Sequence, residues 1–277
     1  MVKAKKAGLL LLAVLVALII LLPLVWMIST AFKNDFEALS GRMNFLPKKP
    51  TVDNFVKGLN GELMNTPVLR WIVNSLVVGT IGTGIVLLID SMAAFALARL
   101  TDLPLRRTLF AMFIASLMIP SVLTFLPMYM EFNSLGLINT YQALILPATA
   151  GAFGVFLLYQ FFISFPKEIE EAARIDGVNK WSLYAKILMP SAVSIMATLG
   201  IFTFMGIYND FVWPLYATTS PEMRTITAGI AMMATGSYTQ SYGKLMAMTT
   251  IATLPVVIIF ILGQKSFVKA ITSAGVK

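Results

Sequence analysis

The sequence has no cysteine and no histidine among its 277 residues. The lack of cysteine excludes disulfides, thiol nucleophiles and cysteine–zinc sites, and the lack of histidine excludes imidazole bases and ligands. Charged residues are also scarce, at 12%, whereas soluble domains contain about 25%. No G-x-x-x-x-G-K-[ST] motif occurs, so the chain does not hydrolyse ATP through a P-loop. The sequence offers no set of catalytic groups, and we expect no enzyme activity in this chain.

Hydrophobic residues make up 58% of the chain, and its mean hydropathy is +0.82. A membrane span needs about 20 apolar residues to cross about 30 Å of hydrocarbon. Six stretches qualify, which predicts an all-α polytopic membrane protein with six transmembrane helices in one domain, residues 1–277. The predicted spans are 7–28, 71–98, 108–130, 141–165, 187–208 and 245–263. The first follows three lysines but is longer than the apolar part of a signal peptide, so we interpret it as a retained anchor.

Residues 225–243 are also uncharged, but they are rich in threonine, serine, glutamine and glycine. Polar groups buried in lipid need partners, which disfavours a seventh span here. We therefore predict that the whole segment 210–244 is a loop outside the membrane.

The net charge of +8 is first a topology signal. An orientation with both termini in the cytoplasm places most lysines and arginines inside, and the loop 131–140 then carries no basic residue outside. The prediction is a multi-pass protein of the cytoplasmic (inner) membrane, and nucleic-acid binding is not expected. Segment 166–186 then faces the cytoplasm and segment 210–244 faces outward.

Segment 166–186 is polar and lies between two apolar runs. Pro166 suits a helix start and the following glutamates suit a first turn, while Gly177 suits a left-handed C-terminal cap. These signals predict a helix of about ten residues, a sharp turn at Gly177 and a second helix from about Lys180. Pro190 is expected to kink that second helix or to loosen its join to the fifth span.

One face of the first helix is predicted to carry Ile169, Ala172, Ala173 and Asp176 at three- and four-residue spacing. Two adjacent alanines would let the surface of another protein approach closely. The alternative is an ordinary solvated amphipathic helix, and the local pattern alone leaves both interpretations open.

The strings "EAARIDG" and "ILMP" in this segment resemble the EAA signature of ABC-importer permeases. Val178 departs mildly from the small residue that often follows the glycine. The strings "YNDFVWPL", "MRTITAGI" and "FVKAITSAGVK" are similar to the smaller permease subunit of maltose-type and multiple-sugar importers. The positions that match the EAA signature are Glu171, Ala172, Ala173, Asp176, Gly177 and Pro190.

The resemblance implies that the EAA loop is a coupling helix seated in a cleft of a cytoplasmic ATPase, whose ATP-driven closure reorients the membrane cavity. The implied partners are a second, different permease, an ATPase dimer, an extracytoplasmic solute-binding protein and a carbohydrate. ATP and magnesium would bind to the ATPase, and this chain would bind no cofactor or metal. The family imports maltose, raffinose-type oligosaccharides, other glycosides and glycerol-phosphate compounds, so the solute stays open.

Two further sites follow from the resemblance. Part of the outer loop, namely Gly236, Ser237, Tyr238 and Thr239, would reach the binding protein. The C-terminal tail, with Ser273, Ala274, Gly275 and Lys277, would contact the ATPase dimer. For the tail, an amphipathic strip on anionic lipid is the alternative.

Asp90 is predicted to lie deep in the second span, where an acid is rare. One interpretation is an acid paired with a neighbouring helix or subunit, which we favour. The other is a contact in the translocation cavity or a proton site, and a proton site would make the chain a proton-coupled secondary transporter that needs no ATPase. Such transporters often show internal repeats, and none is evident here.

Overall fold

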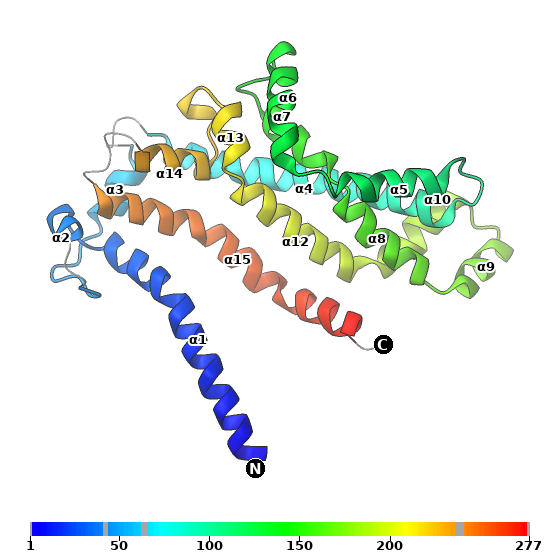
Figure 1. Ribbon diagram of the computed structural model, residues 1–277, viewed down its shortest axis with the longest axis horizontal. Coiled ribbons are helices and arrows are strands. Elements are labelled where there is room, and N and C mark those ends of the chain that lie inside the picture. The colour runs from blue at the N-terminus through cyan, green and yellow to red at the C-terminus, as the bar shows by residue number, and fades with distance from the viewer. Residues whose placement is uncertain (1, 41–43, 62–65, 236–240, 276–277) are drawn as a thin grey trace. The chain divides into compact units, whose positions relative to one another are not determined.

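The computed structural model describes residues 2–40, 44–61, 66–235 and 241–275, and within them the side chains of residues 5–264. Every regular element in these ranges is a helix (Figure 1), which confirms the all-α prediction. The chain divides into two compact units. One consists of residues 1–72 and 226–255, and the other of residues 73–225 and 256–277.

Three helices are single, long and apolar enough to cross a membrane. At 1.5 Å per residue, each exceeds the hydrocarbon thickness of about 30 Å. They coincide with the first, second and sixth predicted spans. These helices are α1 (Val2–Ala31), α4 (Val68–Arg99) and α15 (Tyr242–Gly275).

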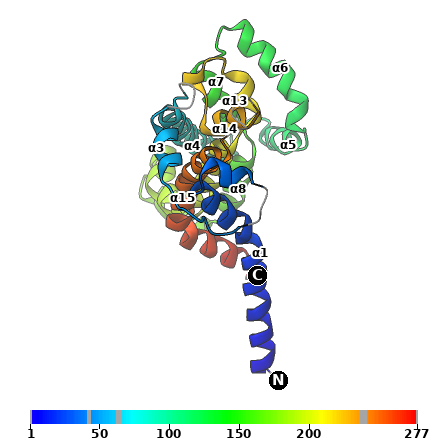
Figure 2. The same ribbon diagram turned by 90° about the vertical axis from the view of Figure 1, so that its left-hand side faces the viewer.

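The other three predicted spans are bent pairs of helices, so the chain has up to six spans if each pair counts as one. The bends measure 98° after α5, 42° before α8 and 77° before α12. Figure 2 shows α6 turning away from α5. The first pair is α5 (Arg106–Ser116) with α6 (Ser121–Ser134). The second is α7 (Tyr141–Ile145) and the 3-10 turn η1 (Leu146–Ala150) with α8 (Phe153–Ser164). The third is α10 (Lys180–Ser182), the π-helical turn η2 (Leu183–Leu188) and α11 (Met189–Ser191) with α12 (Val193–Asn209).

Each bend lies at a residue that interrupts the helical hydrogen bonds. Pro120 precedes α6 in an extended conformation, and Gly151 is extended between η1 and α8. Pro190 lies two residues before the break at Ala192, where the sequence predicts a kink. Hydropathy averaged over a window does not register such single-residue breaks, which explains why the sequence predicted continuous spans.

Segment 210–244 contains helices where the sequence predicts a loop. They are α13 (Val212–Ala217), the 3-10 turn η3 (Pro221–Met223) and α14 (Ile226–Thr235). The ten residues of α14 extend about 15 Å, half of the hydrocarbon thickness, so by length α14 does not span. Two of its buried residues, Ile226 and Met233, are seven residues apart and therefore lie on the same face of the helix, while Ala228 is buried on another side.

In the unit that begins at residue 1, short helices α2 (Asp35–Leu39) and α3 (Asp53–Leu59) follow α1. The buried Asn54 side chain donates to the carbonyls of Ala31 (2.8 Å) and Lys33 (2.6 Å). These bonds satisfy the backbone at the end of α1 and fix α3 beside it.

Among its described residues, the other unit contains two apolar clusters. One is formed where α4, α8, η2 and α12 meet, with Phe95, Leu158, Phe162 and Leu188 at its centre. The second lies among α4, α7 and α13 and includes the buried Trp213. The first cluster includes Ala173 of the EAA loop, and the second includes Trp213, which lines a pocket.

Candidate functional site

The first helix of the EAA loop is α9 (Lys167–Ile175), drawn at the right-hand edge of Figure 1, to the right of α8 and α10. It starts after the extended Pro166, has Glu168 and Glu170 in its first turn and Arg174 in its last. These charges complement the helix dipole. The predicted helix is therefore confirmed, while its cytoplasmic position and coupling role remain predictions.

A Schellman motif ends α9 at Gly177, as the sequence predicts. Gly177 has φ +76°, its N–H donates to Arg174 O (3.0 Å), and the N–H of Val178 donates to Ala173 O (3.0 Å). A Cβ added to Gly177 would meet nothing within 4 Å. The reason for a glycine at this turn is therefore its left-handed backbone conformation and not a close contact with neighbouring atoms.

The next helix starts three residues after the glycine. Asn179 is its N-cap, and its side-chain oxygen accepts a hydrogen bond from the N–H of Ser182 (2.8 Å). The start of α10 at Lys180 is the position predicted from the sequence. Both ends of the turn are fixed by hydrogen bonds, so the loop has one well-defined path.

A buried ion pair connects α9 to the end of α4. Arg99 Nε lies 2.6 Å from Glu170 Oε1, and the side chains are only 6% and 7% exposed. The N–H does not point along the line to the oxygen, so the contact is an ion pair without an aligned hydrogen bond. Arg99 Nη2 also donates to Phe165 O (2.9 Å). Burial raises the pKa of Glu170, and the neighbouring Arg99 opposes this rise.

A second, exposed pair connects the loop after α4 to the start of α10. Lys180 Nζ lies 2.7 Å from Asp102 Oδ2, and this contact lowers the pKa of Asp102. Both side chains are solvated, so this pair adds little stability.

In the core, Tyr184 of η2 and Ser91 of α4 share a buried hydrogen bond of 2.8 Å between their hydroxyls. The EAA loop is therefore held against α4 at several points.

The predicted docking residues divide between two sides of α9. Glu171, Ala172, Asp176 and Gly177 are exposed. Ala173 is 7% exposed and packs in the apolar cluster of its own chain. Of the two alanines, only Ala172 is on the outer face.

The outer face of α9 is apolar at three-residue spacing. Ile169 is 46% exposed and Ile175 is 87% exposed, with Ala172 between them along the helix. Isolated apolar side chains on a surface are common, but three on one short helix form a continuous stripe. Such a stripe suits contact with a second protein.

The remaining predicted contact residues are not described at the side-chain level. Gly236, Ser237, Tyr238 and Thr239 lie outside the described residues, and so does Lys277. Residues 273–275 belong to the backbone of α15, without described side chains. Their roles toward a binding protein and an ATPase stay predictions.

Asp90 is 2% exposed in the middle of α4. Within the part of the chain that the structure describes, its Oδ2 has no hydrogen-bond partner. A Cβ on Gly154 of α8 would lie 2.0 Å from this oxygen, so the acid occupies space that only glycine leaves open. Within the described residues, this oxygen is not paired with a neighbouring helix, and the predicted alternative of a pairing with another subunit stays a prediction.

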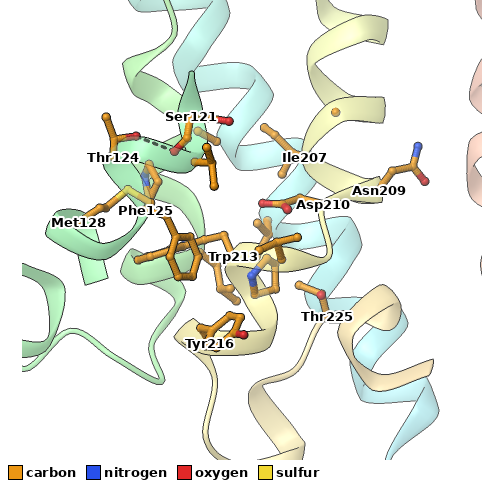
Figure 3. Close-up of a pocket in the computed structure, with 18 of the residues that line it drawn as sticks. Ser121, Thr124, Phe125, Met128, Ile207, Asn209, Asp210, Trp213, Tyr216 and Thr225 are labelled. Atoms are coloured by element: carbon orange, nitrogen blue, oxygen red, sulfur yellow. Dashed lines mark hydrogen bonds between the residues drawn. The ribbon is translucent and has the colours of Figure 1, made fainter. Parts of the chain in front are cut away.

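A pocket that sequence reasoning did not identify lies in the same unit as the EAA loop. Its volume is about 920 Å³, and its lining comes from five stretches of the chain. Figure 3 shows Asp210 between α12 and α13, on the side that faces α6. Polar lining residues include Ser121, Thr124 and Asn209.

Aromatic side chains form one wall of this pocket. Trp213 is fixed by a 2.7 Å hydrogen bond from its indole N–H to Ala143 O. Phe125 packs edge-on against Trp213 (5.9 Å between ring centroids) and Tyr216 (5.2 Å). Trp213 is 6% exposed, whereas Tyr216 is 54% exposed and presents an accessible ring. The string "YNDFVWPL" contains five of the lining residues, but it contains no signal for the part that α6 contributes.

Asp210 is the one acid among the described residues that line the pocket, and no lysine or arginine is among them. Burial raises the pKa of Asp210, while hydrogen bonds from the backbone amides of residues 211–213 act in the opposite direction. These amides fix the position of the carboxylate at the start of α13.

Three comparisons relate this chain to known proteins. The family described as "Binding-protein-dependent transport system inner membrane component" matches residues 91–273, about two-thirds of the chain. The chain is 32% identical to an arabinooligosaccharides transport system permease protein of Halalkalibacterium halodurans, over 95% of this chain and 93% of the relative. It is 31% identical to a diacetylchitobiose uptake system permease protein of Streptomyces coelicolor, over 92% and 83%.

A third relative and one solved structure extend the comparison. The trehalose/maltose transport system permease protein of Thermococcus litoralis is 30% identical, over 96% of this chain and 94% of the relative. A crystal structure of a bacterial ABC transporter involved in the import of the acidic polysaccharide alginate contains a similar chain, with a TM-score of 0.81 and 19% identity. That match covers 95% of this chain and 96% of the other and concerns the fold.

Proposed function

This chain belongs to the family of binding-protein-dependent transport system inner membrane components, and from this premise we propose that α9 couples it to an ATPase partner. The chain is a multi-pass inner-membrane permease of the sugar-importer type, as are its relatives. In the proposed complex it forms the solute path with a second, different permease. ATP and magnesium bind to a cytoplasmic ATPase dimer, and an extracytoplasmic binding protein delivers the solute.

The observation that carries this proposal is the construction of α9. Its C-terminal cap and the buried Arg99–Glu170 pair hold it on the membrane domain, while Ile169, Ala172 and Ile175 are directed outward. A rigid element that is joined directly to α10 transmits a displacement, whereas a flexible loop would absorb it. The proposed orientation has both termini and α9 in the cytoplasm, because it places most basic residues inside.

The substrate that we propose is a sugar or an oligosaccharide. Relatives of 30–32% identity are named for diacetylchitobiose, arabinooligosaccharides, and trehalose or maltose. These compounds are neutral and carry many hydroxyl groups. Neutral carbohydrates are therefore the first compounds to test.

Purification of the tagged chain from its native membrane in mild detergent, followed by mass spectrometry, tests the proposal. We expect a P-loop ATPase and a second permease with its own EAA loop to copurify. If the chain purifies alone in good yield, the coupling role of α9 is wrong. In that case proton-driven transport through Asp90 becomes the function to test.

A further inference from the structure

We propose that the pocket between α6, α12 and α13 is a binding subsite for a neutral sugar, with Tyr216 as the stacking surface and Asp210 as the acceptor for sugar hydroxyls. The inference rests on the proposed function, because it assigns a place in this chain to the imported solute. Its ligand class follows from the lining residues.

The size of the pocket fits a small-molecule site. Its volume of about 920 Å³ lies within the roughly 300–1,000 Å³ that is typical of such sites. These sites combine a mainly apolar wall with a few fixed polar groups, and this pocket has both. The apolar wall is formed by the aromatic rings of Phe125, Trp213 and Tyr216.

The shape of a sugar suits this wall. A pyranose ring has an apolar face of C–H groups and a rim of hydroxyls. The exposed ring of Tyr216 offers a flat surface for the C–H face, and Phe125 supports this ring edge-on at 5.2 Å. Trp213 is held in place by its bond to Ala143 O, so the wall is formed before a ligand arrives.

The polar groups of the pocket suit the hydroxyl rim. A carboxylate has about four acceptor positions, and the fixed carboxylate of Asp210 lines the pocket beside Asn209. Thr124 and Ser121 are exposed on the α6 side and supply hydroxyls (Figure 3). Hydrogen bonds from a ligand to an ionised acceptor are stronger than those to a neutral one.

The charge of the pocket distinguishes neutral from acidic sugars. The described lining has one carboxylate and no lysine or arginine, so a uronic acid would place a second negative charge beside Asp210 without a cation. A lipid acyl chain is also a poor occupant, since it offers no donor to this carboxylate. The pocket therefore favours neutral sugars over both.

The position of the pocket agrees with delivery from outside. Asp210 ends α12, and the pocket begins immediately after the 98° bend that separates α5 from α6. In the proposed orientation this end of α12 is the outer end. A solute released by a binding protein would reach this subsite before it reaches the middle of the membrane.

Equilibrium binding of tritiated maltose, trehalose, lactose and diacetylchitobiose to the purified complex, without its binding protein, tests the proposal. We expect saturable binding of at least one of these sugars. Asp210→Asn and Tyr216→Ala should each weaken it by about tenfold or more, while Tyr216→Phe keeps the ring and most of the affinity. Tyr242→Ala is the matched control, because Tyr242 is similarly exposed (45%) and is not among the lining residues.

Four results would overturn the subsite. The first is that none of the four sugars binds saturably, and the second is that the affinity is unchanged in both pocket variants. The third is that a dimannuronate binds as tightly as the neutral sugars, and the fourth is that the pocket variants lose the second permease from the complex. The last result would mean that the pocket is an assembly surface. Failure of the proposed function is recognised separately, because the ATPase is scored in the same preparation: sugar binding without a copurified ATPase refutes coupling and leaves the subsite standing.

Discussion

Replacement of Gly177 by valine tests the rigidity of the EAA loop. The residue has φ +76°, and a Cβ there would meet no other atom within 4 Å, so the substitution introduces backbone strain and no clash. A residue with a Cβ costs about 1–2 kcal/mol in this conformation, and a β-branched one is at the upper end. If the turn rearranges to relieve the strain, it loses the hydrogen bonds to Arg174 and Ala173, at about 0.5–1.5 kcal/mol each.

Either route disfavours the native turn by about 2 kcal/mol, which corresponds to roughly a thirtyfold shift in its population. We expect Gly177→Val to insert into the membrane at normal levels but to lose at least about tenfold in ATP-driven sugar uptake. Gly177→Asn should retain more uptake, because asparagine tolerates the left-handed region better. Uptake is measured in cells or proteoliposomes, with the amount of assembled complex determined in parallel.

Gly136 provides a matched control. It has φ +67°, open space at its Cβ position and the same cap at the end of α6, where the N–H of Leu137 donates to Phe132 O (2.9 Å). Gly136→Val therefore introduces equal strain far from the EAA loop, and it should leave the coupling of uptake to ATP unchanged. Normal uptake by Gly177→Val, or an equal loss in both variants, would refute the reasoning.

Three further predictions concern buried groups. Glu170→Ala leaves Arg99 buried and unpaired, which should destabilise the chain by about 3–5 kcal/mol in thermal unfolding. The double variant with Arg99→Met should recover much of this loss of stability. A cost of the single variant below about 1 kcal/mol would contradict a buried pair. The pKa of Asp210 is raised above its ordinary value of 3.8, so the folded state keeps this proton to a higher pH than the unfolded state does. The free energy of unfolding should therefore fall as pH rises from 3.8 through the raised pKa. Asp210→Asn should remove this pH dependence of stability, and an unchanged pH dependence would exclude Asp210 as its source. Gly154→Ala places a methyl group against Asp90 Oδ2 and should lower the stability of the chain by about 1–3 kcal/mol. Asp90→Ala in the same chain should relieve this loss. If the effects of the two substitutions simply add in the double variant, this contact is refuted.

The geometry of the EAA loop could be predicted because its signals are local. Pro166, Gly177 and Lys180 each act through their own backbone and near neighbours, and the structure confirms the helix, the turn and the second helix at these positions. The burial of Ala173 could not be predicted, because it depends on an apolar cluster that brings together residues far apart in the sequence.

Contacts between distant segments were not visible in the sequence. The Arg99–Glu170 pair joins residues that are far apart along the chain, and neither residue carries a pattern that points to the other. The pocket has the same origin, since α6 and α13 meet only after the bend at Pro120. The positions of the three long apolar helices, and the approximate positions of the three bent pairs, could be predicted from hydropathy, whereas the bends depend on single residues that a window averages away.

The absence of cysteine permits the most direct test of coupling. Ala172 is exposed on the outer face of α9, and Ala172→Cys would give this subunit a single thiol for a maleimide–benzophenone cross-linker. Leu135→Cys, at a 63% exposed residue beyond the end of α6, is the control. The account predicts that illumination of native membranes links Ala172→Cys, and not Leu135→Cys, to a P-loop ATPase identified by mass spectrometry. The absence of an ATPase adduct from Ala172→Cys, or equal adducts from both positions, would contradict it.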